Sequence, residues 1–155
     1  MTRLRNPTKE AMASFQFKYG IDEYQMTDLF NFPSVEYFRR IGAETVGTTA
    51  LTAACMRAAR FLCERGMLDE YLRSCSAYTP YEPVDLTEFR KECLGLTIGE
   101  MHRYFGGERR DYVRHESKVS ARVGAILRLL HFFYENGLDT EYDDYLDRLD
   151  WGLGI

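Results

Sequence analysis

The chain of 155 residues (18.1 kDa) has the size of one domain and is long enough to bury a core without disulfides or a metal. It is 45% hydrophobic and 28% charged with a net charge of −4, which argues against a disordered, collagen-like or membrane protein. The longest apolar stretch, 123–134, is too short to span a bilayer, and residues 1–20 lack the apolar segment of a secretory signal. We therefore expect a cytoplasmic protein with no membrane contact and one domain over residues 1–155.

Helix start and stop signals are dense in the first half of the chain, and alternating strand patterns are absent. A helix that opens at Pro7 ends at Gly20, because proline suits the first turn and glycine suits the position after the last. Asp22 with Gln25 predicts a capping box, and Ser34 caps the next helix. The predicted helices in this half cover 7–19, 22–30, 34–41, 48–65 and 68–74.

The second half follows a stretch rich in proline and turn formers, the predicted linker 76–84. Asp85 with Glu88 predicts a helix start, and Thr97 with Glu100 forms a second capping box. The predicted helices cover 85–93, 98–106, a long segment from 108 or 112 to 134, and 139–149. The fold class is therefore all-α, a multi-helix bundle of about eight short helices.

One phrase occurs twice, as FLCERGMLDEY at 61–71 and FFYENGLDTEY at 132–142. Aligning 47–72 with 118–143 gives eight identities in 26 positions without a gap. Each copy describes a helix, a glycine stop and a short helix, which together form a helical hairpin. Two interpretations stay open: a duplication that gives halves 1–75 and 85–155 joined by the linker 76–84, or two unrelated amphipathic hairpins.

The helix predicted near residues 119–134 is apolar on most of its circumference. Such a helix is either the central helix of the monomer or a helix shared with a second subunit, so a homodimer is an open alternative.

No motif for catalysis or metal binding is present in the sequence. The four cysteines form no Cys-x-x-Cys pair, and the three histidines are scattered. We expect free thiols, with Cys55 and Cys63 buried in a helix, and we assign no catalytic residue, no metal and no cofactor. An enzyme built from scattered residues is the least supported class.

Charge is divided unevenly along the second half. Residues 103–128 hold seven basic and three acidic side chains, whereas residues 135–150 hold seven acidic side chains and one basic. An acidic final helix could dock on a basic protein surface, including one that normally binds nucleic acid. Our first hypothesis is accordingly a non-catalytic adaptor, regulator or inhibitor that binds another protein. Its predicted contact residues are Tyr78, Tyr81, Glu141, Asp143, Asp144 and Asp147.

The alternative hypothesis is a transcription regulator that binds DNA. Residues 24–42 and 96–118 can each be interpreted as a helix, a tight turn and a second helix, the layout of a helix-turn-helix. A sequence pI of 5.4 counts against it, although a local basic face can suffice. The predicted exposed residues of the first segment are Ser34, Glu36, Tyr37 and Arg40. The predicted nucleic-acid-binding residues are Arg103, Arg109, Arg110, Arg114 and Lys118.

Overall fold

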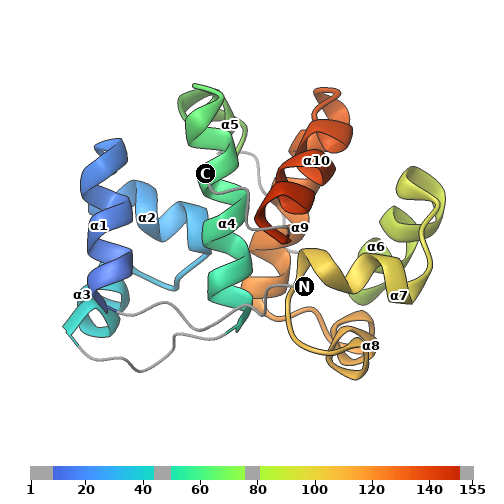
Figure 1. The fold of residues 1–155 in the computed structure, drawn as a ribbon. Coiled ribbons are helices and arrows are strands. Elements are labelled where there is room, and N and C mark those ends of the chain that lie inside the picture. Colours follow the sequence, from blue (N-terminus) through green and yellow to red (C-terminus); the bar gives the residue numbers. More distant parts are fainter. Residues whose placement is uncertain (1–8, 44–49, 76–80, 151–155) are drawn as a thin grey trace.

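The computed structural model describes residues 9–43, 50–75 and 81–150. Within these ranges the chain forms ten α-helices and no strand, so the predicted all-α class is confirmed. Figure 1 shows helices α4 and α9 side by side in the middle, with α1–α3 on one flank and α6–α8 on the other. The first half contains α1 (Lys9–Tyr19), α2 (Glu23–Phe30), α3 (Val35–Ala43), α4 (Ala50–Glu64) and α5 (Leu68–Ser74).

The second half has five helical segments as well. It contains α6 (Pro83–Glu88) with the π-helical continuation η2 (Phe89–Leu94), α7 (Ile98–Met101) with the 3-10 turn η3 (His102–Tyr104), α8 (Arg109–Ser117), α9 (Ala121–Glu135) and α10 (Asp139–Asp150).

Local chemistry sets most helix ends. The Asp22 carboxylate accepts a hydrogen bond from the Gln25 amide at 2.8 Å, and the Gln25 side chain accepts from the Asp22 amide at 3.0 Å. These two bonds satisfy amides that have no partner within the helix, so α2 begins as predicted. Gly66 and Gly137 end α4 and α9 with φ of 69° at both residues, a left-handed conformation in which glycine avoids the steric cost of a Cβ atom.

The two hairpins that contain the repeated phrase share their boundaries. Helices α4 and α9 both have 15 residues and start 71 positions apart, as do the starts of α5 and α10. The hydrogen bonds at the two corners also match, since Met67 N donates to Leu62 O at 3.2 Å and Leu138 N donates to Phe133 O at 2.7 Å. The hairpin geometry agrees with the repeat, whereas a duplication of the sequence stays a prediction.

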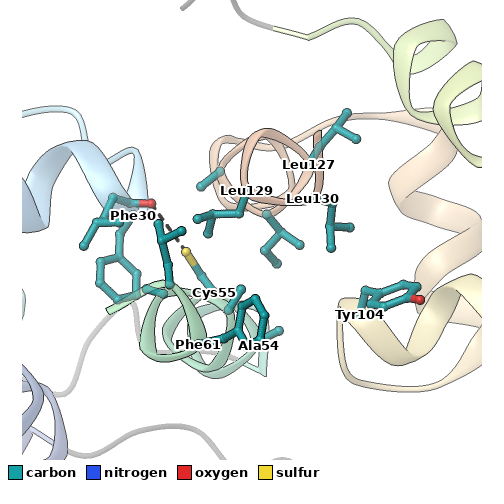
Figure 2. Close-up of a cluster of buried hydrophobic side chains, with 14 of the residues drawn as sticks. Phe30, Ala54, Cys55, Phe61, Tyr104, Leu127, Leu129 and Leu130 are labelled. Atoms are coloured by element: carbon teal, nitrogen blue, oxygen red, sulfur yellow. Dashed lines mark hydrogen bonds between the residues drawn. The ribbon is translucent and has the colours of Figure 1, made fainter. Parts of the chain in front are cut away.

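Helix α9 lies at the centre of the core, buried within this chain over most of its length. Figure 2 shows Leu127, Leu129 and Leu130 of α9 above α4, with Phe30 of α2 on one side and Tyr104 of η3 on the other. In α4, Ala54 and Cys55 are small enough to let the two helices approach closely, and the Cys55 thiol donates to the Leu29 carbonyl. Among the described helices, none is both long and apolar enough to cross a membrane.

Two predicted boundaries are wrong. The sequence predicts a linker up to residue 84, but α6 begins at Pro83 because Glu82 and Asp85, rather than Asp85 and Glu88, form the capping box. The long helix from 108 or 112 to 134 is interrupted at residues 118–120. Ser120 caps α9 there by accepting from the Val123 amide, which starts a new helix in a new direction.

Candidate functional site

The segment from α7 to α8 consists of two helices joined by a tight turn. Thr97 caps α7, since its hydroxyl accepts from the Glu100 amide at 3.2 Å and the Glu100 carboxylate accepts from the Thr97 amide at 3.0 Å. The side chain of Phe105 closes the turn from inside with no exposed surface. Gly106 and Gly107 follow with φ of 74° each, so the chain reverses within a few residues.

Helix α8 starts where the second glycine ends the turn. The Glu108 amide donates to Asp111 Oδ2 at 2.8 Å as part of a capping box. A Cβ atom at Gly107 would lie 2.8 Å from that same Asp111 oxygen, so the cap requires glycine at this position. The direction of α8 is therefore fixed by the turn and by the cap together.

One face of α8 is held against the protein by packing and by an ion pair. Tyr112 is fully buried and its ring centroid lies 5.3 Å from that of Phe105. Near the end of the helix, Glu116 pairs with Arg90 of η2, with Arg90 Nε 2.5 Å and Arg90 Nη2 3.2 Å from the two carboxylate oxygens. Both side chains are shielded, with 9% and 13% of their surface exposed.

Further hydrogen bonds complete this ion pair. Thr87 Oγ1 donates to Glu116 at 3.0 Å, and Arg90 Nη1 donates to the Leu96 carbonyl at 3.0 Å. Burial raises the pKa of Glu116, but the hydrogen bonds, first among them that from Arg90, outweigh burial and bring the pKa below its ordinary value. Glu116 is thus ionised at neutral pH, and the pair fixes α8 to η2.

The opposite face of α8 is exposed and basic. Its side chains recur at helical spacing along one stripe, which consists of Arg109, Arg110, Val113, Arg114 and Ser117. Arg110 lies 3.0 Å from Glu108 and Arg114 lies 3.9 Å from Asp111. Such solvent-exposed pairs are weak, about 0–1 kcal/mol, so they leave the arginines available to a ligand. Lys118 extends the stripe just after the helix, also exposed.

The structure brings together four of the five predicted nucleic-acid-binding residues. Arg109, Arg110, Arg114 and Lys118 share the stripe, whereas Arg103 belongs to η3 and reaches Asp147 of α10 at 2.9 Å. Val113, with 50% of its surface exposed, and Ser117 were not predicted as site residues. The four-residue spacing 109, 113, 117 is the signal in the sequence that would have identified them.

The predicted protein-docking residues are mostly engaged within the chain. Glu141 forms an ion pair with Arg65, Asp147 pairs with Arg103, and Asp143 accepts a hydrogen bond from the Tyr104 hydroxyl. Burial raises the pKa of Asp143, and Tyr104 and Arg103 lower it in part. Asp144 is exposed.

The two linker tyrosines give little further support. Tyr81 is half-buried with its ring stacked on His131 at 5.9 Å, and Tyr78 lies outside the described residues. Of the five docking residues that the structure describes, Asp144 and Asp147 are exposed, whereas Tyr81, Glu141 and Asp143 are half-buried.

The first half contains a similar pair of helices, α2 and α3. Its turn passes through Asn31, which has φ of 56°, and the Ser34 hydroxyl accepts from the Tyr37 amide at 3.1 Å. Of the residues predicted to be exposed there, Glu36 and Arg40 are exposed, while Ser34 and Tyr37 are half-buried.

The thiols and the possible metal ligands of the described residues form no site of their own. All four cysteines are free thiols, and Cys55 is buried as predicted, which raises its pKa to about 12, whereas Cys63 is half-buried. In the described part of the chain, no three His, Cys, Asp or Glu side chains are grouped so that they could hold a metal ion.

Comparison with family models, curated proteins and solved structures finds no match to this chain.

Proposed function

We propose that this protein binds double-stranded DNA through α7, its glycine turn and α8, and that it acts as a non-catalytic regulator of transcription. The supporting observation is the division of α8 into two faces. Tyr112 and Glu116 hold one face inward, and the other presents three arginines with a small apolar side chain between them. The second helix of a helix-turn-helix is the one that enters the major groove.

The composition of the exposed stripe suits this role. Arginine binds phosphate oxygens and the O6 and N7 acceptors of guanine, and a small apolar side chain such as Val113 suits the methyl group of thymine. Ser117 and Lys118 can add contacts to the backbone. The net charge of −4 is offset locally by the basic stripe of α8, and the acidic helix α10 begins at the opposite end of the molecule (Figure 1), although its Asp147 contacts Arg103 of η3.

The first sequence hypothesis, docking of a protein on α10, has less support from the contacts. The Tyr104 hydroxyl is bound to Asp143, so a partner would have to displace it or use the exposed Asp144 and Asp147. It remains a separate proposal for the same chain.

The test begins with selection of bound sequences from a random pool of DNA duplexes. Arg109, Arg110 and Arg114 are then changed together to alanine, and affinity for the selected duplex is measured by fluorescence anisotropy over a range of salt concentrations. We expect affinity to fall at least about 100-fold. We also expect the slope of log affinity against log salt concentration to become shallower by the equivalent of about three phosphate contacts.

A matched control removes the same charge elsewhere. Arg65 in the turn after α4, Arg73 of α5 and Arg148 of α10 are exposed, and their combined change to alanine lowers the net charge by the same amount. This control is expected to bind nearly as tightly as the unmodified protein. Equal affinity of the α8 variant and the unmodified protein would contradict the proposal.

A further inference from the structure

The helical segments of the second half repeat those of the first in order, turn by turn. Gly20 and Gly95 both have φ of 63°, and each is followed by a capping box, formed by Asp22 with Gln25 and by Thr97 with Glu100. A left-handed residue follows each second helical segment: Asn31 comes directly after α2, and Gly106 comes shortly after η3. Helices α3 and α8 both have nine residues and start 74 positions apart. The correspondence thus extends well beyond the repeated phrase.

Aromatic contacts between the halves occur in exchanged pairs. Phe61 of the first half packs on Tyr142 of the second with ring centroids 5.2 Å apart. Phe132, which corresponds to Phe61, packs on Tyr71, which corresponds to Tyr142, also at 5.2 Å. Exchange of partners between equivalent positions is the property of an interface related by a two-fold axis.

Arg57 and Arg128, which occupy corresponding positions, repeat the exchange. Arg57 of α4 donates to the carbonyl of Arg103 in the second half at 2.6 Å, and Arg128 of α9 donates to the carbonyl of Asp28 in the first half. Arg128 Nε also donates to the Tyr71 hydroxyl at 2.8 Å. Arg57 and Tyr142 correspond to Arg128 and Tyr71. Burial raises the pKa of Tyr142, and the charge of Arg57 lowers that pKa in part. The two halves are therefore arranged about an approximate two-fold axis between α4 and α9.

This arrangement places α3 and α8 at the same end of the molecule, on opposite sides of the α4–α9 pair (Figure 1). Hydrogen bonds fix the position, since Arg122 Nη1 donates to the Phe30 carbonyl at 2.9 Å and Asn31 Nδ2 donates to the Ala121 carbonyl at 3.1 Å. The turn before α3 thus rests on the start of α9, and α8 leads into the same start.

We propose that the protein is a single-chain counterpart of a two-fold helix-turn-helix dimer, with α8 on one DNA half-site and α3 on a second half-site about one helical turn away. Dimers of this class place two recognition helices in successive major grooves on one face of the duplex, with half-sites about 10–10.5 base pairs apart. Here both helices come from one chain. The inference rests on the proposed DNA binding of α8.

The two recognition helices are unequal, so the site is expected to be non-palindromic. Helix α3 exposes Glu36, Arg39 and Arg40 where α8 exposes Arg110, Val113 and Arg114. Arg39 is 2.7 Å from Glu23, and the Arg40 guanidinium lies over the Tyr37 ring.

The buried ion pair of the second half also lacks a counterpart. Gly42 stands at the position that corresponds to Glu116, so no side chain there can anchor the end of α3 as Glu116 anchors α8. We expect α8 to contribute the larger share of affinity and α3 a weaker second contact.

Hydroxyl-radical footprinting on the selected duplex tests this proposal, with the mass of the complex measured by sedimentation. The unmodified protein is expected to protect two patches on one face, about one helical turn apart, with one chain per duplex. The double variant Arg39→Ala and Arg40→Ala is expected to lose one patch and about tenfold in affinity. Inserting five base pairs between the patches should lower the affinity of the unmodified protein by about the same factor as the double variant, because the insertion moves the second half-site to the opposite face of the duplex.

The outcomes separate this proposal from the proposed function. Full affinity and an unchanged footprint in the α3 variant would overturn the two-half-site inference while leaving DNA binding by α8 intact. Two chains bound to one duplex in sedimentation would have the same consequence. Failure of the unmodified protein to select any duplex would overturn both. A double variant with Arg65→Ala and Arg148→Ala removes the same charge outside α3 and α8 and should keep both patches.

Discussion

At the scale of single residues, the Arg90–Glu116 pair is the contact on which the orientation of α8 most depends. Changing Glu116 to glutamine leaves Arg90 charged and shielded with its main partner lost. Breaking a buried ion pair by removing one partner costs about 3 kcal/mol. We therefore expect Glu116→Gln to lower the free energy of unfolding by about 3 kcal/mol at pH 7, measured in urea. The exposed Glu88, changed to glutamine, is a neighbouring control expected to have little effect.

The pH dependence of the same variant gives a second readout. Because the folded pKa of Glu116 lies below its ordinary value of 4.5, the pair stabilises the protein above that value. This stabilisation is lost as pH falls through the folded pKa, so the difference between the unmodified protein and Glu116→Gln should shrink in acid. A difference that stays constant down to pH 3 would show that Glu116 does not act through its charge.

At the scale of elements, the glycine turn before α8 makes a prediction of its own. Gly107→Ala places a Cβ atom against Asp111 in addition to the cost of a left-handed alanine. Gly95 also has a positive φ but nothing within 4 Å of its Cβ position, so Gly95→Ala measures the backbone cost alone, about 1 kcal/mol. We expect Gly107→Ala to lower the free energy of unfolding, measured in urea, by about 1 kcal/mol more than Gly95→Ala does, because the Cβ atom disturbs the α8 cap. Equal losses would mean that Asp111 moves aside freely.

The elements themselves could largely be predicted from the sequence. Capping boxes at Asp22 and Thr97 and the stop at Gly66 act over three or four residues, and the sequence displays all of their parts. The break at residues 118–120 was missed because apolar residues continue in helical spacing across it. The direction of α9 is set by its packing against α4, and the direction of α8 is set by the Arg90–Glu116 ion pair. These are tertiary contacts, so the apolar pattern of the sequence does not show that the two helices diverge.

At the scale of the whole molecule, the contacts between the halves predict cooperative unfolding. Arg128→Met removes the hydrogen bonds to the Tyr71 hydroxyl and the Asp28 carbonyl, both in the first half. Loss of two bonds to a buried charged donor costs about 3 kcal/mol. Amide hydrogen exchange should therefore accelerate in α2 and α5 as well as in α9. Faster exchange confined to α9 would show that the halves unfold independently.

The sequence by itself determined the all-α class, most helix boundaries and the matching hairpins, because helix starts, stops and apolar periodicity depend on neighbours within a few positions. Only the tertiary structure decided which charges remain open to a partner. Arg103 and Asp147 are 44 residues apart and Tyr104 and Asp143 are 39 apart, yet each pair is in contact, so Asp143 is half-buried beside Tyr104 while Asp147 stays exposed beside Arg103. Long-range pairing of this kind follows from how the helices pack, and so does the placement of α3 and α8 at one end of the molecule.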